Sequence, residues 1–313
     1  MKDKIIDKVK KVKSKVFNKK TEVRTPSKIT WCPGCFNNQI LAGVEKYLKK
    51  QIESSENAAK KKDEFALVTG IGCHGKMFDY LNLNGLNTLH GRVLPTMLGI
   101  KIGNPNLNVI GFAGDGDAYA EGVSHLVHAA RYNADLNYFV HNNQVFALTV
   151  GQPTPTTEIG FKDKTNPFGV KVPPLNPMKF MLANGATFVA RVFADSKQIS
   201  WVMKEAIKHK GFSFIEVLQP CIVFHPHKGY KEQTYMLQGK KNKKSKGKSE
   251  KHDKTSFKQA WKKAEEFDYN PVTKKTKIPL GIFYQVSKET FEEQIPAVLA
   301  LKKQGKSWKD IER

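Results

Sequence analysis

Two short polar sequences near the middle of the chain have residue types and spacing that suit binding of a phosphate and a divalent cation. An apolar run at residues 109–113 leads into Gly-Asp-Gly-Asp at residues 114–117, and a second apolar run at 138–140 is followed by Asn142 and Asn143. Glycines let a ligand approach the backbone, and the first turn of a following helix presents free N–H groups to a diphosphate. A carboxylate together with amide oxygens is a ligand set that suits Mg2+.

The stretch between these sequences has the length of a strand-helix-strand unit. Residues 123–130 carry one apolar helical stripe between the two predicted strands. Such a unit brings Asp115 and Asn143 to the carboxyl edge of a parallel sheet, where doubly wound proteins bind ligands. A Gly-Asp-Gly sequence alone is equally consistent with a tight turn and a capping aspartate, but the paired asparagines favour a ligand site.

Strands and helices are predicted to alternate on both sides of this unit, which favours an α/β fold with a doubly wound, mostly parallel sheet and helices on both faces. A segment rich in Pro, Thr and Gly at residues 152–174 predicts a long loop over the site. The predicted strands are residues 65–69, 187–193 and 212–218, and the predicted helices begin at Asn37, near Pro95, after an Asn176 cap and after a Ser196 cap.

The four cysteines are a second candidate for chemistry. Cys32 and Cys35 form a Cys-x-x-Cys pair, while Cys73 and Cys221 follow predicted strands at the expected ligand edge. Disulfides are disfavoured in a cytoplasmic chain, so free thiols or a metal site remain. The Cys-x-x-Cys pair alone fits a redox motif, a zinc site or neither, and composition does not separate zinc from an iron–sulfur cluster.

The chain of 313 residues carries a formal net charge of +23, which first suggests a partner such as nucleic acid. Much of this charge lies at residues 1–20 and 240–254, which read as lysine-rich appendages, the second of them a low-complexity insertion. Apolar residues spaced on one face of the first segment also fit a basic amphipathic helix. A non-enzymatic basic binding protein is the least favoured interpretation, because it leaves the ordered motifs without a role.

The sequence has no apolar run long enough for a signal-peptide core or a membrane span. We therefore expect a cytoplasmic protein. The expected domains are an extension at 1–24, a main domain at 25–230, the lysine-rich insertion at 231–256 and a C-terminal segment at 257–313 that packs on the domain or on a partner.

Six strings occur along the chain in this order: WCPGC, GIGCHGK, LHGR, GDGDAYAEG, HNN and ALTVGQPTPTT. Their sequence and order resemble those of the β subunits of 2-oxoacid:ferredoxin oxidoreductases, and residues 279–286 match the closing segment of that family more loosely. The resemblance implies a thiamine-diphosphate-binding fold of the diphosphate type, with Mg2+ and a [4Fe-4S] cluster as further cofactors.

The resemblance also implies a role for individual residues. The cluster ligands are Cys32, Cys35, Cys73 and Cys221, and the Mg2+ ligands are the side chains of Asp115 and Asn143 with the carbonyl of Val145. Cofactor contacts are implied for Gly114, Asp115, Gly116, Asp117, Asn143, Val145, His74 and Gly75. Substrate or catalytic contacts are implied for His90, Arg92, Lys76 and Leu148.

By this resemblance the chain oxidatively decarboxylates a 2-oxoacid with coenzyme A and passes electrons through the cluster to ferredoxin. Since the chain holds one cofactor domain, an α subunit with the pyrimidine-binding domain should complete the site. Neither nucleic acid nor a membrane span is expected. The alternative is a non-redox thiamine-dependent decarboxylase or carboligase subunit with structural zinc. Phe36 and Val150 depart from the family, which often has Gly at the first position and Lys or Gly at the second.

Overall fold

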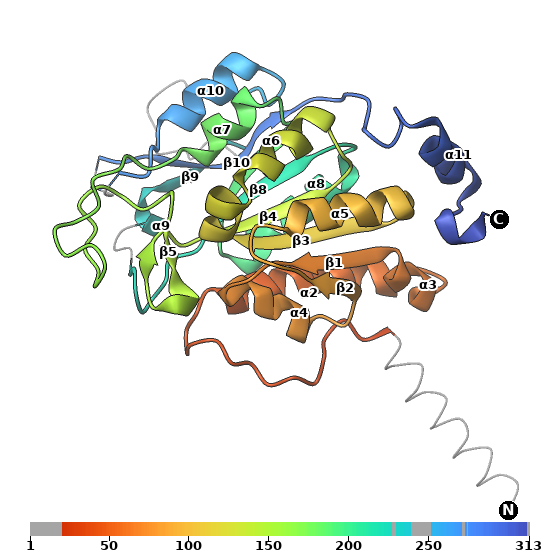
Figure 1. The fold of residues 1–313 in the computed structure, drawn as a ribbon, viewed down its shortest axis with the longest axis horizontal. Helices are drawn as coiled ribbons and strands as arrows, with labels where there is room; N and C mark the ends of the chain where they lie inside the picture. Colours follow the sequence, from red (N-terminus) through yellow and green to blue (C-terminus); the bar gives the residue numbers. More distant parts are fainter. Residues whose placement is uncertain (1–20, 227–229, 239–251, 271–272, 274, 312–313) are drawn as a thin grey trace, which may run out of the picture.

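One twisted sheet forms the centre of the molecule (Figure 1). The computed structural model describes residues 21–226, 230–238, 252–270, 273 and 275–311. Within these ranges eight strands pair in the order β2-β1-β3-β4-β8-β7-β10-β9. Six of them, from β2 to β7, run parallel, whereas β10 is antiparallel to β7 and parallel to β9. The mostly parallel α/β sheet predicted from the sequence is therefore confirmed.

The strands are short and, apart from those at the two edges, almost wholly buried. Alternation of their side chains sends Phe65 and Leu67 of β1 into one core, and Ala66 and Val68 into another on the opposite face. The strands are β1 (Phe65–Thr69), β2 (Asn84–Asn87), β3 (Asn108–Gly114), β4 (Asn137–Asn142), β7 (Phe188–Phe193), β8 (Ser213–Leu218), β9 (Thr234–Met236) and β10 (Ile278–Gln285).

Helices cover both faces, as a doubly wound fold requires (Figure 1). The core of the first face includes α2 and α8, which pack against each other, and that of the second includes α5, α6, α7 and α10. The helices are α2 (Asn37–Glu53), α3 (Ala58–Asp63), α4 (Met77–Tyr80), α5 (Val93–Gly103), α6 (Val123–Tyr132), α7 (Pro177–Ala183), α8 (Ser196–Lys208), α9 (Tyr230–Gln233), α10 (Phe257–Glu265) and α11 (Pro296–Gln304).

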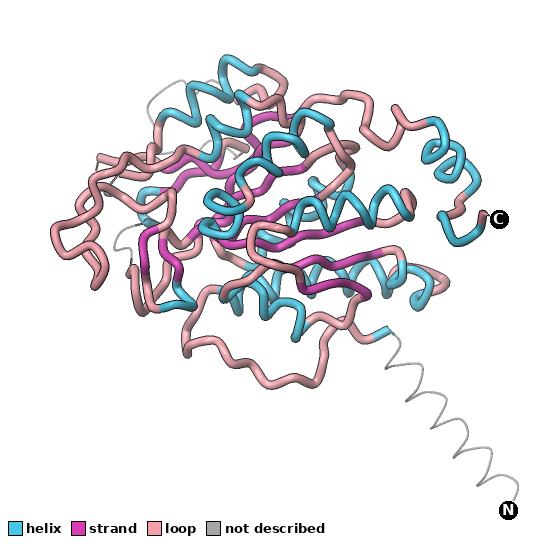
Figure 2. The backbone as a smooth tube through the Cα atoms, in the orientation of Figure 1, coloured by secondary structure: helices cyan, strands magenta, loops and turns pink. Residues whose placement is uncertain are grey.

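The loops after β1, β3, β4 and β8 meet at the carboxyl edge of the sheet. A β5 (Val145–Phe146) and β6 (Gln152–Pro153) hairpin stands there, followed by a long loop up to α7 (Figure 2). The predicted loop at 152–174 is confirmed in this form. Between β3 and α6 the chain forms one π-helical segment, Asp117–Glu121, so the Gly-Asp-Gly-Asp sequence leads directly from strand into helix.

Several predictions from the sequence need correction or fall outside the described residues. Asp195, not Ser196, caps α8, because its carboxylate accepts the N–H groups of Lys197 and Gln198. The polar strand β2 was missed. Residues 234–236, expected within the lysine-rich insertion, form the edge strand β9. The expectations for residues 1–20, and for 240–254 up to residue 251, lie outside the described residues.

Where the structure describes the chain, none of its helices is long and apolar enough to cross a membrane.

Candidate functional site

A pocket with about 500 Å3 of empty space lies at the carboxyl edge of the sheet. Its walls come from the loops after β1, β2, β3, β4 and β8, so the parallel strands bring together residues that the sequence predicted to meet. Nine of the predicted site residues outside the cysteines line it: His74, His90, Gly114, Asp115, Gly116, Asp117, Asn143, Val145 and Leu148.

Asp115 is 1% exposed and its carboxylate is fixed by three donors. Its Oδ2 accepts the hydroxyls of Thr154 at 2.5 Å and Thr156 at 3.0 Å. Its Oδ1 accepts only a long contact, 3.4 Å, from the backbone N–H of Asn143. Burial raises the Asp115 pKa to about 6, although these hydrogen bonds oppose the shift. Oδ1 is therefore the oxygen with coordination capacity left.

The residues after β4 supply further oxygen atoms beside Asp115. The Asn143 side-chain oxygen accepts the backbone N–H of Val145 at 3.1 Å, which folds this segment back on itself. Gln144 between them has a φ of +60° and donates its side-chain amide to the carbonyl of Thr156 at 2.6 Å. One carboxylate, one amide oxygen and nearby backbone carbonyls form a set of hard oxygen ligands, and this set fits Mg2+.

Asp117 organises the opposite wall of the pocket. Its Oδ2 lies 3.0 Å from Nε2 of His74, and its Oδ1 accepts the backbone N–H of Gly91. Gly91 has a φ of +74°, which favours glycine and turns this N–H toward the carboxylate. His90 lies close by, with Nδ1 2.9 Å from Glu121 Oε2. Asp117 thus fixes two glycine-containing loops around the start of the helical segment.

The four cysteines line a second pocket. Cys32 is exposed and the other three are half-buried. Burial, together with the nearby Cys35, Cys221 and Cys32 thiols, raises the pKa of Cys73 to about 11. Polar hydrogens point at the sulfur atoms: the backbone N–H of Phe224 lies 3.4 Å from Cys221 Sγ, Gln219 Nε2 lies 3.8 Å from Cys35 Sγ, and Asn37 also donates to Cys35.

The four thiols form the ligand set of a known kind of metal centre. An iron–sulfur cluster binds four cysteines, and four cysteines line this one pocket. The mutual repulsion expected of four thiolates is relieved by a cationic metal centre. The donor set fits an iron–sulfur cluster.

The two pockets share a wall. Residues that line both are Cys73, Asn143, Ala147, Leu148 and Gln219.

Apart from the cysteines, three predicted site residues lie outside the first pocket. Arg92 directs its guanidinium to His125 on α6, at 2.8 Å, and Lys76 lines the cysteine pocket. Gly75 is buried, and a side chain at this position would collide with the backbone carbonyl of Gly70.

The sequence analysis missed residues that support the site. Thr154 and Thr156 lie in a segment whose sequence has no helical or strand periodicity. Their contact with Asp115 is visible only in the structure, where both are buried. Arg191 and Glu216 carried a signal that could have been used, because each is a single charge inside an apolar predicted strand. A charge at such a position is rarely buried without a partner.

Comparison with known proteins adds independent evidence. Residues 70–217 match the family model "Thiamine pyrophosphate enzyme, C-terminal TPP binding domain", and residues 227–299 match the model for the C-terminal part of the pyruvate ferredoxin oxidoreductase beta subunit. The β subunit of a 2-oxoacid:ferredoxin oxidoreductase from Saccharolobus solfataricus is 37% identical over 307 residues, covering 90% of this chain and 94% of the relative. The chain belongs to the family of 2-oxoacid:ferredoxin oxidoreductase β subunits.

Other members of this β-subunit family agree. The 2-oxoglutarate synthase subunit KorB of Archaeoglobus fulgidus is 42% identical over 194 residues, covering 61% of this chain and 69% of that protein. Among solved structures, a 2-oxoglutarate:ferredoxin oxidoreductase from Magnetococcus marinus, with 2-oxoglutarate, coenzyme A and succinyl-CoA bound, matches with a TM-score of 0.77 and 27% identity. That match covers 92% of this chain and 91% of the other. The thiamine-diphosphate-binding fold expected from the sequence is confirmed.

Proposed function

We propose that this β subunit acts in the oxidative decarboxylation of a 2-oxoacid with coenzyme A, giving an acyl-CoA and carbon dioxide while ferredoxin takes up the electrons. The observation that carries the proposal is the wall shared by the two pockets. A non-redox thiamine enzyme needs no four-thiol pocket beside its oxygen-lined one, whereas an oxidoreductase needs an electron exit there. When bound, thiamine diphosphate supplies a nucleophilic carbon and an iron–sulfur cluster supplies one-electron transfer.

In this proposal the first pocket binds the diphosphate end of the cofactor. Oδ1 of Asp115, the side chain of Asn143 and the carbonyl of Val145 hold Mg2+. Gly114, Gly116 and Asp117 lie at the diphosphate. Glycine is required at position 116, because a side chain there would collide with the Phe146 ring. His74 and Gly75 position this wall from the loop after β1.

The remaining predicted residues are assigned by their place at the rim. His90 lines the pocket and is proposed to contact cofactor or substrate, and Leu148, which is 53% exposed, is proposed to line the substrate space. Lys76 is proposed to receive a carboxylate from the side of the cysteine pocket. Arg92 reaches the site only if its contact with His125 gives way to substrate.

The site requires a partner. Thiamine chemistry needs a carboxylate, normally Glu, on the aminopyrimidine ring, and the described residues that line the pocket include no Glu. We infer that an α subunit with the pyrimidine-binding domain supplies it. Exposed apolar side chains at the rim, including Val150 and Val223, suit coverage by such a partner. The net positive charge of the chain suits the acidic surface of a ferredoxin.

The test is purification of the complex without oxygen, followed by iron analysis and visible absorption, with and without Cys73→Ala. We expect about four irons per β chain, a broad band that dithionite bleaches, and loss of both in the variant. Ferredoxin reduction should then require a 2-oxoacid and coenzyme A, and comparison of pyruvate with 2-oxoglutarate identifies the preferred acid. A colourless complex that contains zinc would contradict the proposal and favour a non-redox thiamine enzyme.

A further inference from the structure

Two charged side chains are completely buried in the middle of the sheet and take no part in the proposed chemistry. Arg191 on β7 and Glu216 on β8 are both 0% exposed, and Nε of Arg191 lies 2.6 Å from Oε2 of Glu216. The hydroxyl of Tyr269 donates to Glu216 and accepts from Nη2 of Arg191, both at 2.5 Å. Three side chains from distant parts of the sequence thus form one closed polar group.

Burial of such a pair is costly, which makes its retention informative. Apolar replacements of similar volume often stabilise a fold as well as a buried ion pair does, since desolvation offsets the attraction between the charges. Nη1 of Arg191 has no hydrogen-bond partner among the described residues. The pair is therefore not explained well by stability alone.

From Glu216 a line of hydrogen bonds leads toward the candidate cation site. Oε1 of Glu216 accepts the side-chain amide of Asn142, at the end of β4, at 2.7 Å. The other side-chain atom, Asn142 Oδ1, accepts the backbone N–H of Gln144 at 3.1 Å and the hydroxyl of Thr156 at 2.9 Å. The hydroxyl of Thr156 also lies 3.0 Å from Oδ2 of Asp115, so its single hydrogen is shared between Asn142 and Asp115.

The orientation of Asn142 is fixed from both ends by this arrangement. An ionised Glu216 only accepts hydrogen bonds, so it selects the NH2 group of Asn142. The backbone N–H of Gln144 only donates, so it selects Oδ1. A flipped amide would place the NH2 group of Asn142 against the backbone N–H of Gln144 and its oxygen against the carboxylate of Glu216. Glu216 thereby fixes Asn142 Oδ1 as one of the two acceptors between which the hydroxyl of Thr156 is held.

We propose that Glu216, held by Arg191 and Tyr269, is a positioning residue for the cation site. It acts through Asn142 on Thr156, which together with Thr154 occupies Oδ2 of Asp115 and leaves Oδ1 for the metal. The inference rests on the proposed function, since it assigns Asp115 to Mg2+. It extends that assignment to a group of residues that touches neither cofactor nor substrate.

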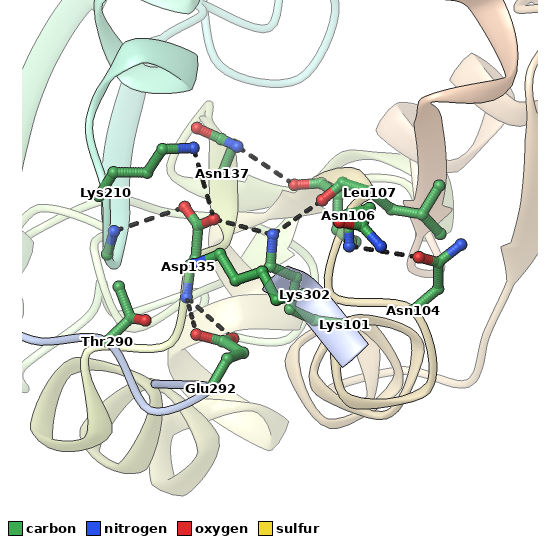
Figure 3. Close-up of polar contacts among 12 residues, drawn as sticks. Lys101, Asn104, Asn106, Leu107, Asp135, Asn137, Lys210, Thr290, Glu292 and Lys302 are labelled. Carbon is green, nitrogen blue, oxygen red and sulfur yellow. Dashed lines mark hydrogen bonds and ion pairs between the residues drawn. The ribbon is translucent and has the colours of Figure 1, made fainter. Parts of the chain in front are cut away.

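A second buried ion pair, at the amino edge of the sheet, provides a matched control. Lys101 and Asp135 form an ion pair at 2.8 Å on the amino side of β4, with side chains 4% and 9% exposed (Figure 3). None of the hydrogen bonds described for Asp135 leads to Asp115. Asp135→Asn therefore breaks a buried pair without altering the contacts of the candidate cation site.

The experiment measures metal affinity rather than turnover. The full chain, in complex with its partner subunit, is freed of divalent metal and titrated with Mn2+ at fixed thiamine diphosphate, while free Mn2+ is followed by electron paramagnetic resonance. We expect Glu216→Gln to raise the half-saturating Mn2+ about 10- to 100-fold, as loss of supporting contacts around metal ligands commonly does. Tyr269→Phe should shift it in the same direction by less, and it keeps the ion pair should Glu216→Gln fail to fold.

A second pair of variants tests the last contact in the line. Thr156→Val removes the hydroxyl and should raise the half-saturating Mn2+, whereas Thr156→Ser keeps the hydroxyl and should restore the affinity. Asp135→Asn should lower the melting temperature of the metal-free complex but leave the Mn2+ titration unchanged. A purely structural role for Glu216 predicts instead that Glu216→Gln and Tyr269→Phe behave like this control, and that outcome overturns the proposal.

One further variant separates this inference from the proposed function. If Asp115→Asn binds Mn2+ like the unmodified chain, the assignment of the cation site itself is wrong. If Asp115→Asn abolishes binding while Glu216→Gln and Tyr269→Phe have no effect, the site stands and only the positioning role fails.

Discussion

Two buried ion pairs, one inside the sheet and one at its amino edge, differ in what they are connected to. Inside the sheet, Arg191 and Glu216 connect through Asn142 to the residues around Asp115. At the amino side, Lys101 and Asp135 connect to backbone groups (Figure 3). The same physical element, a buried pair of opposite charges, therefore supports a ligand site at one edge and chain connections at the other.

The amino-side pair joins segments that are distant in the sequence. Lys101 also donates to the carbonyl of Leu107 at 2.8 Å, and Oδ1 of Asp135 accepts the backbone N–H of Gly211 at 3.4 Å. The backbone N–H of Asp135 lies 3.1 Å and 3.2 Å from the two carboxylate oxygens of Glu292. These contacts attach the segment after β10 to the main sheet.

The largest effect is expected at the carboxyl edge itself. Asp115→Asn removes the only carboxylate of the proposed cation site, and we expect activity and affinity for thiamine diphosphate to fall by more than about a hundredfold, beyond the usual cost of changes to supporting residues. Turnover and cofactor titration of the complex measure this loss. Equal cofactor affinity in the variant and the unmodified complex would contradict the assignment.

A large effect of another kind is expected at the amino edge. Asp135→Asn leaves the buried ammonium of Lys101 without its counter-ion, so the free energy of unfolding should fall by about 3–5 kcal/mol. Chemical denaturation of the metal-free complex measures the change. Substitution of the exposed Glu53 at the end of α2 by Gln, which lies outside both networks, serves as the control. A large shift in cofactor affinity in Asp135→Asn would remove the contrast between the two edges.

The amino edge should also respond to pH. Burial lowers the pKa of His209, which precedes β8, to about 4. Because this folded-state pKa lies below the unfolded value of about 6.5, the stability contributed by neutral His209 is present above pH 6.5 and is lost as pH falls toward 4. Melting temperatures of His209→Gln should therefore fall less steeply over this range than those of the unmodified complex. Identical pH profiles would show that His209 has no such role.

The smallest effect is expected at the rim of the pocket. Val150 has a φ of +74°, which is strained for a β-branched residue, and it is 61% exposed. Val150→Gly should relieve this strain and stabilise the β chain by about 1 kcal/mol. The same change removes exposed apolar surface, so the affinity for the partner subunit should decrease slightly. Destabilisation in a denaturation experiment would show that Val150 packs more favourably than its exposure indicates.

The sequence predicted the elements of the fold better than the contacts between them. A local apolar run was sufficient to predict β1, and the Asn-Pro sequence was sufficient to predict the Asn176 cap of α7. Both features depend only on neighbouring residues. The sequence predicted that Ser196 caps α8, but Ser196 is the first residue of the helix. The cap is Asp195, whose carboxylate is the stronger acceptor for the first N–H groups of the helix. The motif around Asp115 was found because its spacing reflects a single strand-helix-strand unit.

The supporting network was beyond such reasoning for a physical reason. Arg191, Glu216 and Tyr269 lie on separate elements, and their association depends on the order of the strands in the sheet. Local patterns carry no information about that order. The antiparallel direction of β10 escaped the prediction for the same reason.

The wall that the two pockets share has a consequence for the path of the electrons. If both pockets are filled as proposed, only the residues of that wall separate the two centres. Electrons then cross within a single subunit, and no segment of this chain has to carry them from one centre to the other.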